Sequence, residues 1–303
     1  MVNFLFRGRI RLYAILSLIS QILIVVTGGA VRLTGSGLGC PTWPECQPGS
    51  LVSVPELGIH GFIEFANRLL TFVLLLVALF TFIAVLRLPK PERRGGPFWT
   101  SFSLGLGIIV QAVIGGISVL TGLNSWIVGL HFVVSAALIS IAAILVWYSR
   151  GANVFPTNRL TKITTATLFP FGVLTILIGV VVTGAGPHAG DADTPRNGLD
   201  IDLFAHLHSY PAYVTLGLSV LLVLLVYRAK QPLASSAALL GTLAGQAIVG
   251  IIQTRSGLPI LLVGIHMLGA ATLAYLLTWQ MLVRGIWLDR KSTRLNSSHS
   301  DRS

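Results

Sequence analysis

Charged residues are scarce in this sequence, and their scarcity indicates its class. Only 10% of the 303 residues are Asp, Glu, Lys or Arg, whereas a soluble domain contains roughly 25%. Hydrophobic residues make up 53%. This composition excludes an ordinary soluble domain and indicates an integral membrane protein.

The hydrophobic residues gather in runs that are long enough to cross a bilayer, which takes about 20 residues. Eight such runs are present, at positions 11–31, 61–86, 98–121, 126–148, 162–184, 203–227, 233–254 and 259–285. We therefore expect an all-α integral membrane protein with eight transmembrane helices. The first run follows several arginines, as in a signal peptide, but it lacks a clear small-residue cleavage site, so we expect it to be retained.

Acidic residues are also few, 10 against 21 Lys and Arg, which gives a net charge of +11. Such an excess can serve nucleic-acid binding, but the positions of the charges argue against that function. With eight crossings, 17 of the 21 basic residues lie on the side of the two termini. The others are Arg32, Arg196 and Arg255 on the outer side and Arg68 within a run. This bias predicts a plasma-membrane protein with both termini cytoplasmic and no nucleic-acid partner.

Cysteine is almost absent. The two cysteines, Cys40 and Cys46, lie in "GLGCPTWPECQPG" between the first and second runs, on the outer side. That compartment is oxidising, and the spacing allows a disulfide. A structural staple is the favoured interpretation, and a redox couple is the alternative.

The sequence contains an internal repeat. "GLNSWIVGLH", which ends at His131, and "GLPILLVGIH", which ends at His266, lie 135 positions apart, and the match extends upstream to Gln111 and Gln246. A second pair, "VVTGGAVRLTGSG" and "VVTGAGPHAGDAD", links the ends of the first and fifth runs. We expect two pseudo-symmetric four-helix bundles in parallel orientation, formed by residues 1–150 and 151–288. We expect residues 289–303 to be a disordered or non-native polar tail.

Histidines stand at one depth in both halves. His131 lies near the start of the fourth run and His266 near the start of the eighth, while His206 and His208 open the sixth. Imidazole is a common axial ligand of heme iron, and bundle cores are where hemes sit. The alternative is a core histidine that is hydrogen-bonded to a neighbour. A zinc site is disfavoured, because neither half offers three nitrogen or sulfur ligands together.

Small residues lie beside these histidines, at Gly129, Gly264, Gly269 and Ala270. They would allow a flat macrocycle to approach the backbone, or only allow helices to pack closely. His188, in the loop after the fifth run, is expected to be a solvated loop residue.

The second run begins with "HGFIEFANRLL", which holds His60, Glu64, Asn67 and Arg68. The spacing places His60, Glu64 and Asn67 on one helical face. Glu64 and Arg68 are four residues apart, so they can form an internal ion pair. Because a buried charge in lipid is costly, a functional carboxylate that binds a substrate group or relays protons is the favoured interpretation.

These motifs resemble those of the bacterial heme A synthase family: "GGAVRLTGSGLGCPTWPEC" after the first run, "IEFANR" in the second, and histidines that open the even runs. The resemblance covers nearly the whole chain except the tail. It implies an oxidoreductase that converts a methyl group of heme O to the formyl group of heme A through hydroxylated intermediates. It also implies a heme b cofactor in the C-terminal half and the heme O substrate in the N-terminal half.

The resemblance assigns roles to particular residues. His208 and His266 would be the axial ligands of heme b, with His206 disfavoured because it lies about 200° around the same helix. His131 would face the iron of the substrate heme. Glu64 matches the functional glutamate of the family. Cys40 and Cys46 match its outer-loop cysteine pair.

One position departs from the family. Many members have histidine where this chain has Asn67, and arginine next, as here at Arg68. The second axial ligand in the N-terminal half is therefore open. His60 could replace it, Asn67 could hold a water, or the iron could be five-coordinate. His131, Asn67, Arg68 and His60 form the candidate set for the substrate heme.

Three other functions compete with this one. A di-heme cytochrome b that takes electrons from quinol would need two histidines in each half, and Asn67 counts against it. A heme-delivery protein would hold exchangeable heme without oxygen dependence. A prenyltransferase would need aspartate-rich motifs, which the membrane-level segments lack. The resemblance implies heme O synthase and cytochrome oxidase assembly as partners, within the lipid bilayer, and specifies no electron donor.

Overall fold

The computed structural model describes residues 9–286, and within that range it is almost entirely helical, without a β-strand. It contains eight long helices: α2 (Ile10–Leu33), α3 (Gly58–Leu86), α5 (Gly96–Leu120), α6 (Ser125–Ser149), α7 (Arg159–Ala185), α8 (Ile201–Arg228), α9 (Ala234–Arg255) and α10 (Ile260–Val283). All eight are long and apolar enough to cross a membrane, so the predicted multi-pass fold is confirmed. The polar tail at 289–303 lies outside the described residues.

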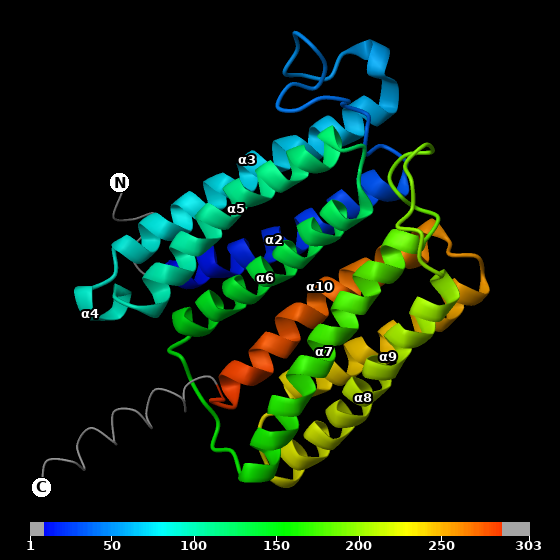
Figure 1. The fold of residues 1–303 in the computed structure, drawn as a ribbon. Helices are drawn as coiled ribbons and strands as arrows, with labels where there is room; N and C mark the ends of the chain where they lie inside the picture. Colours follow the sequence, from blue (N-terminus) through cyan, green and yellow to red (C-terminus); the bar gives the residue numbers. More distant parts are fainter. Residues whose placement is uncertain (1–8, 287–303) are drawn as a thin grey trace, which may run out of the picture.

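The helices form two groups of four (Figure 1). In the first group α2 contacts α3 and α6, and α5 contacts the same two helices; in the second group α7 contacts α8 and α10, and α9 contacts these two. The groups meet where α2 and α6 pack on α10 and where α6 packs on α7. The order of neighbours is therefore the same in both groups, as the repeat predicts. The pseudo-symmetry itself stays a prediction.

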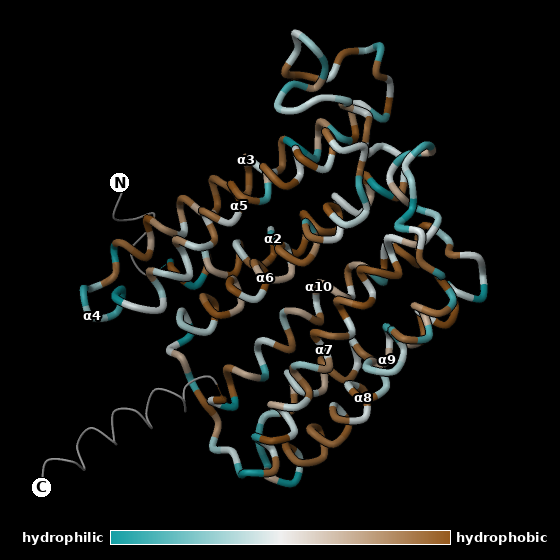
Figure 2. The backbone as a smooth tube through the Cα atoms, viewed as in Figure 1, coloured by the Kyte–Doolittle hydropathy of each residue, from teal (hydrophilic) through white to brown (hydrophobic). Residues whose placement is uncertain are grey.

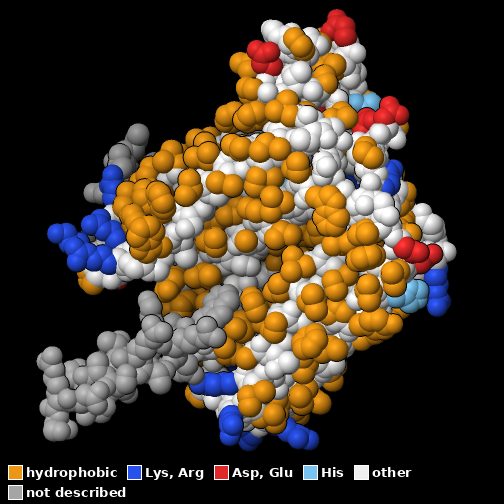
Figure 3. All heavy atoms as spheres, viewed as in Figure 1, with side chains coloured by type: hydrophobic (Ala, Val, Ile, Leu, Met, Phe, Trp, Pro, Cys, Tyr) orange, Lys and Arg blue, Asp and Glu red, His pale blue; other side chains and the backbone are white. Residues whose placement is uncertain are grey.

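The lipid-exposed character of the chain is visible on its surface. Figure 2 shows hydrophobic residues along all of the long helices, and Figure 3 shows apolar side chains covering the flanks, with Lys and Arg gathered mainly at the ends. Large side chains such as Phe72 and Leu261 are 65% and 74% exposed. An apolar surface of this kind fits a lipid bilayer. Inside the bilayer the backbone N–H and C=O groups must form hydrogen bonds within the protein, and helices provide these bonds.

The core joins the two groups. Leu18 of α2, Ile139 of α6 and Ala271 of α10 are all buried in one hydrophobic cluster. Small residues allow the close approach: a Cβ atom added at Gly29 of α2 would lie 2.9 Å from Cε of Met267 on α10. Close packing at small residues is a typical source of helix association in lipid.

A buried arginine closes the end of the second group that lies away from the loop 34–57. Arg284, just after α10, is 0% exposed, and it donates to Gln231 Oε1 and, at 3.3 Å, to Ser236 Oγ. Its guanidinium carbon lies 5.5 Å from the ring centroid of Phe155. Burial lowers the pKa of the Arg284 guanidinium from its usual value. The side chain thus ties the end of α10 to α9 and to the segment that links the two groups.

Candidate functional site

A glycine faces each of three half-buried histidines across a helix hairpin. The pairs are Gly115 with His131, Gly179 with His208, and Gly250 with His266. A Cβ atom added at these glycines would lie 3.3, 2.9 and 3.5 Å, respectively, from the Cε1 atom of the histidine. Each imidazole therefore occupies space that a side chain on the neighbouring helix would fill.

The fourth hairpin, α2–α3, repeats the arrangement with asparagine. A Cβ atom added at Gly28 would lie 3.9 Å from Nδ2 of Asn67. The Oδ1 atom of Asn67 is buried and has no hydrogen-bond partner. Asn67 thus stands in the place that histidine occupies in the other three hairpins. We call Asn67, His131, His208 and His266 the hairpin row.

His60 lies outside the hairpin row. It is seven residues before Asn67, about 10 Å along the helix, and it is exposed at the start of α3. Its Nδ1 atom is 2.9 Å from Ser36 Oγ. The structure therefore attaches His60 to the loop 34–57 and does not bring it to the level of Asn67.

His208 and His266 face each other. Their ring centroids are 6.3 Å apart, with an angle of 68° between the planes, and both Nδ1 atoms are buried without a partner. Two imidazoles on opposite sides of one metal ion, each at about 2 Å, would have centroids about 6 Å apart. The pair therefore fits a bis-histidine iron. The rival His206 is exposed, and its Nδ1 lies 2.7 Å from the carbonyl of Asp202.

His131 is fixed by hydrogen bonds to its backbone carbonyl, and these leave its ring unbonded. Its carbonyl accepts hydrogen bonds from Gln111 Nε2 at 2.9 Å and from Ser135 Oγ at 3.0 Å. The ring Nδ1 is buried without a partner, as is Oε1 of Gln111. α5 and α6 are thereby joined beside an imidazole that has an unused nitrogen.

Glu64 is hydrogen-bonded to the loop 34–57, which contains both cysteines and is called the disulfide loop below. Cys40 and Cys46 form the expected disulfide. The Glu64 side chain is buried; its Oε2 accepts the backbone N–H of Cys40 at 2.7 Å, and its Oε1 accepts Nε and Nη2 of Arg68 at 3.1 and 2.5 Å. Both carboxylate oxygens therefore have protein donors. The internal ion pair is present, and the catalytic role of Glu64 stays a prediction.

Arg68 has no spare donor. Besides Glu64 it binds the carbonyls of Cys40, Thr42 and Glu45 at 3.0, 3.0 and 3.2 Å. These bonds use all five N–H groups of the guanidinium. A heme carboxylate would have to displace one of them, so the geometry does not favour Arg68 as a heme-binding residue.

The glycines singled out from the sequence serve helix packing. Added Cβ atoms at Gly129 and Gly264 would meet Val180 and Leu33 of neighbouring helices, and one at Gly269 would overlap the side chain of Gln246. The close-packing alternative is therefore correct for these three. The glycines that face the imidazoles were missed, although two of them, Gly115 and Gly250, belong to the sequence repeat.

The prediction for His188 is wrong. The residue is half-buried rather than solvated, and its Nε2 lies 2.8 Å from the carbonyl of Leu258, in the turn before α10. The same loop is bound to the disulfide loop, because Gly37 N–H donates to the Gly190 carbonyl at 2.8 Å. The loop 34–57 of the first group and the loop 186–200 of the second are thus joined.

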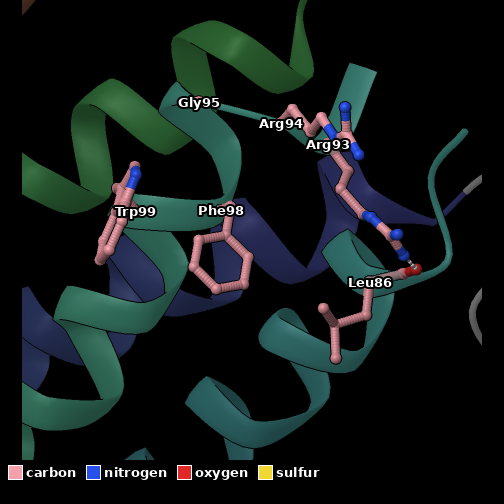
Figure 4. Close-up of a pocket in the computed structure, with 6 residues that line it drawn as sticks. All are labelled: Leu86, Arg93, Arg94, Gly95, Phe98 and Trp99. Carbon is pink, nitrogen blue, oxygen red and sulfur yellow. Dashed lines mark hydrogen bonds between the residues drawn. The ribbon is translucent and has the colours of Figure 1, made fainter. Parts of the chain in front are cut away.

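Two surface cavities lie outside the hairpin row. One is at the opposite end of the first group, lined by Leu86, Arg93, Arg94, Gly95, Phe98 and Trp99 (Figure 4). Arg93 in this cavity donates to the carbonyl of Leu86 at 2.8 Å. The other is an apolar groove between α7 and α8 that includes Leu207 and Tyr210. Among residues 9–286 there is no cluster of three His, Cys, Asp or Glu side chains that could hold a metal ion.

Fold and site together define a multi-pass membrane protein with histidines held in the cores of two helix groups. A family model described as cytochrome oxidase assembly protein matches residues 11–57 and 52–278. The chain belongs to this family, which is the one that contains the bacterial heme A synthases.

Curated relatives with the name heme A synthase match a shorter stretch. That of Lysinibacillus sphaericus is 36% identical over 138 residues, which is 44% of this chain and 42% of the relative. That of Bacillus pumilus is 30% identical over 137 residues, 45% of this chain and 43% of the relative. The aligned part of the chain therefore spans less than half the length of these relatives.

Proposed function

We propose that this protein is a heme A synthase, an oxidoreductase that converts a methyl group of heme O into the formyl group of heme A. Membership of the family and the name of the curated relatives support this function. The observation that carries it is the hairpin row: two facing histidines in one group, and one histidine with one asparagine in the other. A pair of unlike sites suits one resident cofactor and one exchangeable substrate.

In the C-terminal half, residues 151–288, His208 and His266 would hold heme b. The 6.3 Å between their rings and their unpaired buried nitrogens support this assignment. Gly179 and Gly250 keep the neighbouring helices clear of the rings. A heme b bound there supplies one-electron redox chemistry, and the two strong ligands keep it in place during the reaction.

In the N-terminal half, residues 1–150, His131 would bind the iron of heme O, and Asn67 would face the same heme. A carboxamide is a far weaker iron ligand than imidazole, so the substrate would be free to enter and leave. The unpaired Oδ1 atom of Asn67 can accept a hydrogen bond from a water or from a hydroxyl group on the substrate. Asn67 would thus orient a reacting group, whereas its histidine counterparts would hold heme iron.

Glu64 would bind a proton or order a water as the methyl group is oxidised. It lies three residues before Asn67 and therefore on the same side of α3. The Cys40 N–H and the Arg68 guanidinium stabilise its carboxylate form. Proton uptake at Oε2 would compete with the Cys40 hydrogen bond, which links the chemistry to the position of the disulfide loop.

The surroundings of the enzyme follow from the same proposal. The charge bias supports a plasma-membrane location with cytoplasmic termini, so the hairpin row lies near the outer face. Heme O and heme A are the substrate and product. Heme O synthase would deliver the substrate, and cytochrome oxidase assembly would receive the product.

The decisive experiment is to purify the protein, extract its hemes and identify them by chromatography and mass. Heme b together with heme O, heme A or a hydroxylated intermediate is the expected result. Heme b alone, in two equivalents, would make the protein a di-heme cytochrome b. Loosely held, exchangeable heme with no oxygen-dependent product would make it a delivery protein.

A further inference from the structure

Arg32 is an arginine at a membrane-helix end with most of its donors unused. It is the last residue but one of α2 and is half-buried. Its Nη2 donates to the carbonyl of Thr183 on α7 at 2.7 Å, while its Nε is buried and has no partner. Arg68, by contrast, has every donor occupied. The donors of Arg32 and Arg68 are therefore in opposite states.

No carboxylate neutralises Arg32 within the described chain. Asp191 and Asp193 lie in the loop that passes over it, yet neither forms an ion pair with it among residues 9–286. The charged group that acts on Arg32 is another cation, Arg196 of the same loop, which is exposed. A half-buried guanidinium beside a second one is costly unless an anion binds there. The surroundings of Arg32 therefore favour the binding of an anion from outside the described chain.

The position of Arg32 relates it to the ring of His208. Thr183, which binds Arg32, lies one helical turn after Gly179 on α7, and Thr183 Oγ1 donates to the Gly179 carbonyl at 2.7 Å. Gly179 is the residue whose added Cβ would lie 2.9 Å from His208 Cε1. Thr183, which accepts the Arg32 hydrogen bond, therefore lies about 6 Å along α7 from Gly179, toward the outer face. That is the side on which charged edges of a ligand avoid lipid.

We propose that Arg32, assisted by Arg196, binds a propionate carboxylate of the heme held by His208 and His266. The inference rests on the proposed heme b site and deepens it. A guanidinium presents two parallel N–H groups to a carboxylate, and Arg32 has an unused Nε–H beside its terminal nitrogens. Because Arg32 belongs to α2, the N-terminal group would clamp the cofactor of the C-terminal group.

The test compares Arg32→Gln with Arg32→Lys. Both replacements can still donate to the Thr183 carbonyl, but only lysine keeps the positive charge. Arg255→Gln, at the exposed outer end of α9, is the matched control. Arg32→Gln, which removes the positive charge, should lower the reduction midpoint potential of the low-spin heme, because a nearby cation favours the reduced form. Arg32→Lys and Arg255→Gln should leave the potential close to that of the unmodified protein.

Binding of a modified heme identifies the carboxylate as the partner. The full-length protein, produced under heme limitation, is titrated with heme and with heme dimethyl ester. The unmodified protein should bind the ester roughly 10- to 100-fold more weakly, the effect of losing a charge-assisted hydrogen bond. In Arg32→Gln this difference should nearly vanish, as in a double-mutant cycle.

The inference is overturned if the ester binds as well as heme does, or if the difference persists in Arg32→Gln. It is also overturned if the glutamine and lysine variants shift the potential equally, since Arg32 would then be a structural tie to Thr183. Neither result depends on heme A formation, so failure here is separate from failure of the proposed reaction. A chain that binds no low-spin heme at all would remove both.

Discussion

His208 of α8 and His266 of α10 stand ring to ring across the second helix group, 6.3 Å between centroids, each with a neighbouring glycine against its edge. No hydrogen bond of either Nδ1 atom accounts for this placement. Buried polar atoms without a hydrogen-bond partner are rare in membrane interiors unless a ligand binds them.

Alanine at His208 or at His266 is expected to abolish the low-spin heme spectrum, because one axial ligand is lost. His206→Ala should largely spare it, since His206 is exposed and bound to the Asp202 carbonyl. Absorption and electron paramagnetic resonance spectra of the purified variants measure the outcome. A spectrum that survives His208→Ala but not His206→Ala would exchange the two assignments.

Glu64→Gln is expected to reduce heme A formation by about 100-fold or more, the usual size of a lost proton-transfer group. The heme b spectrum should stay intact, because Glu64 lies in the other helix group. His131→Ala should likewise reduce heme A formation and leave the heme b spectrum intact. Heme extracts of cells that make heme O measure both variants.

The contacts of Glu64 require a control for its structural role. The amide can still bind the Cys40 N–H or Arg68, so the disulfide loop should persist in Glu64→Gln, which protection of both cysteines from alkylation checks. Normal heme A formation in this variant would show that Glu64 serves only as an ion-pair partner of Arg68.

Asn67→His should complete the hairpin row with a fourth imidazole. We expect a second low-spin, bis-histidine heme to appear, with slower product formation because the substrate iron is then held from both sides. Asn67→Ala is the matched control and should give no second low-spin signal. A spectrum of Asn67→His identical to that of the unmodified protein would show that this position does not face iron.

Gly179→Ala tests the space that the row requires. The added methyl would lie 2.9 Å from His208 Cε1, so the ring must move, at a cost of about 1–3 kcal/mol in overpacking. Heme b affinity should fall by roughly tenfold or more. Gly217→Ala on α8 is the control, because nothing lies within 4 Å of its added methyl. Equal heme contents in the two variants would contradict the role given to Gly179.

The sequence predicted what apolar length and spacing can determine. Eight runs became eight helices, and the depth of His131, His208 and His266 followed from their place at the starts of even runs. The hydrogen bonds of Arg68 were beyond such reasoning, because three of its partners are carbonyls of an irregular loop whose path no periodicity describes. His188 was misjudged for the same reason: its partner, Leu258, belongs to a loop 70 residues away.

Which glycine faces which ring also needed the structure. Gly115 and Gly250 belong to the sequence repeat, but Gly179 does not. The sequence also does not tell which neighbouring helix a given helix face contacts. The glycines chosen for their closeness to histidine in the chain, such as Gly264, turned out to face other helices. Closeness in sequence was a poor guide here because residues adjacent on a helix point about 100° apart.

Each member of the hairpin row meets its glycine within a single helix hairpin, so every imidazole is positioned by local contacts. A heme held by His208 and His266 would instead connect α8 to α10, and so join two hairpins that form separately. Ligation would then act as a cross-link added late in assembly. By mass action the C-terminal bundle should resist unfolding more strongly as free heme rises, which couples the lifetime of the enzyme in the membrane to the supply of its cofactor.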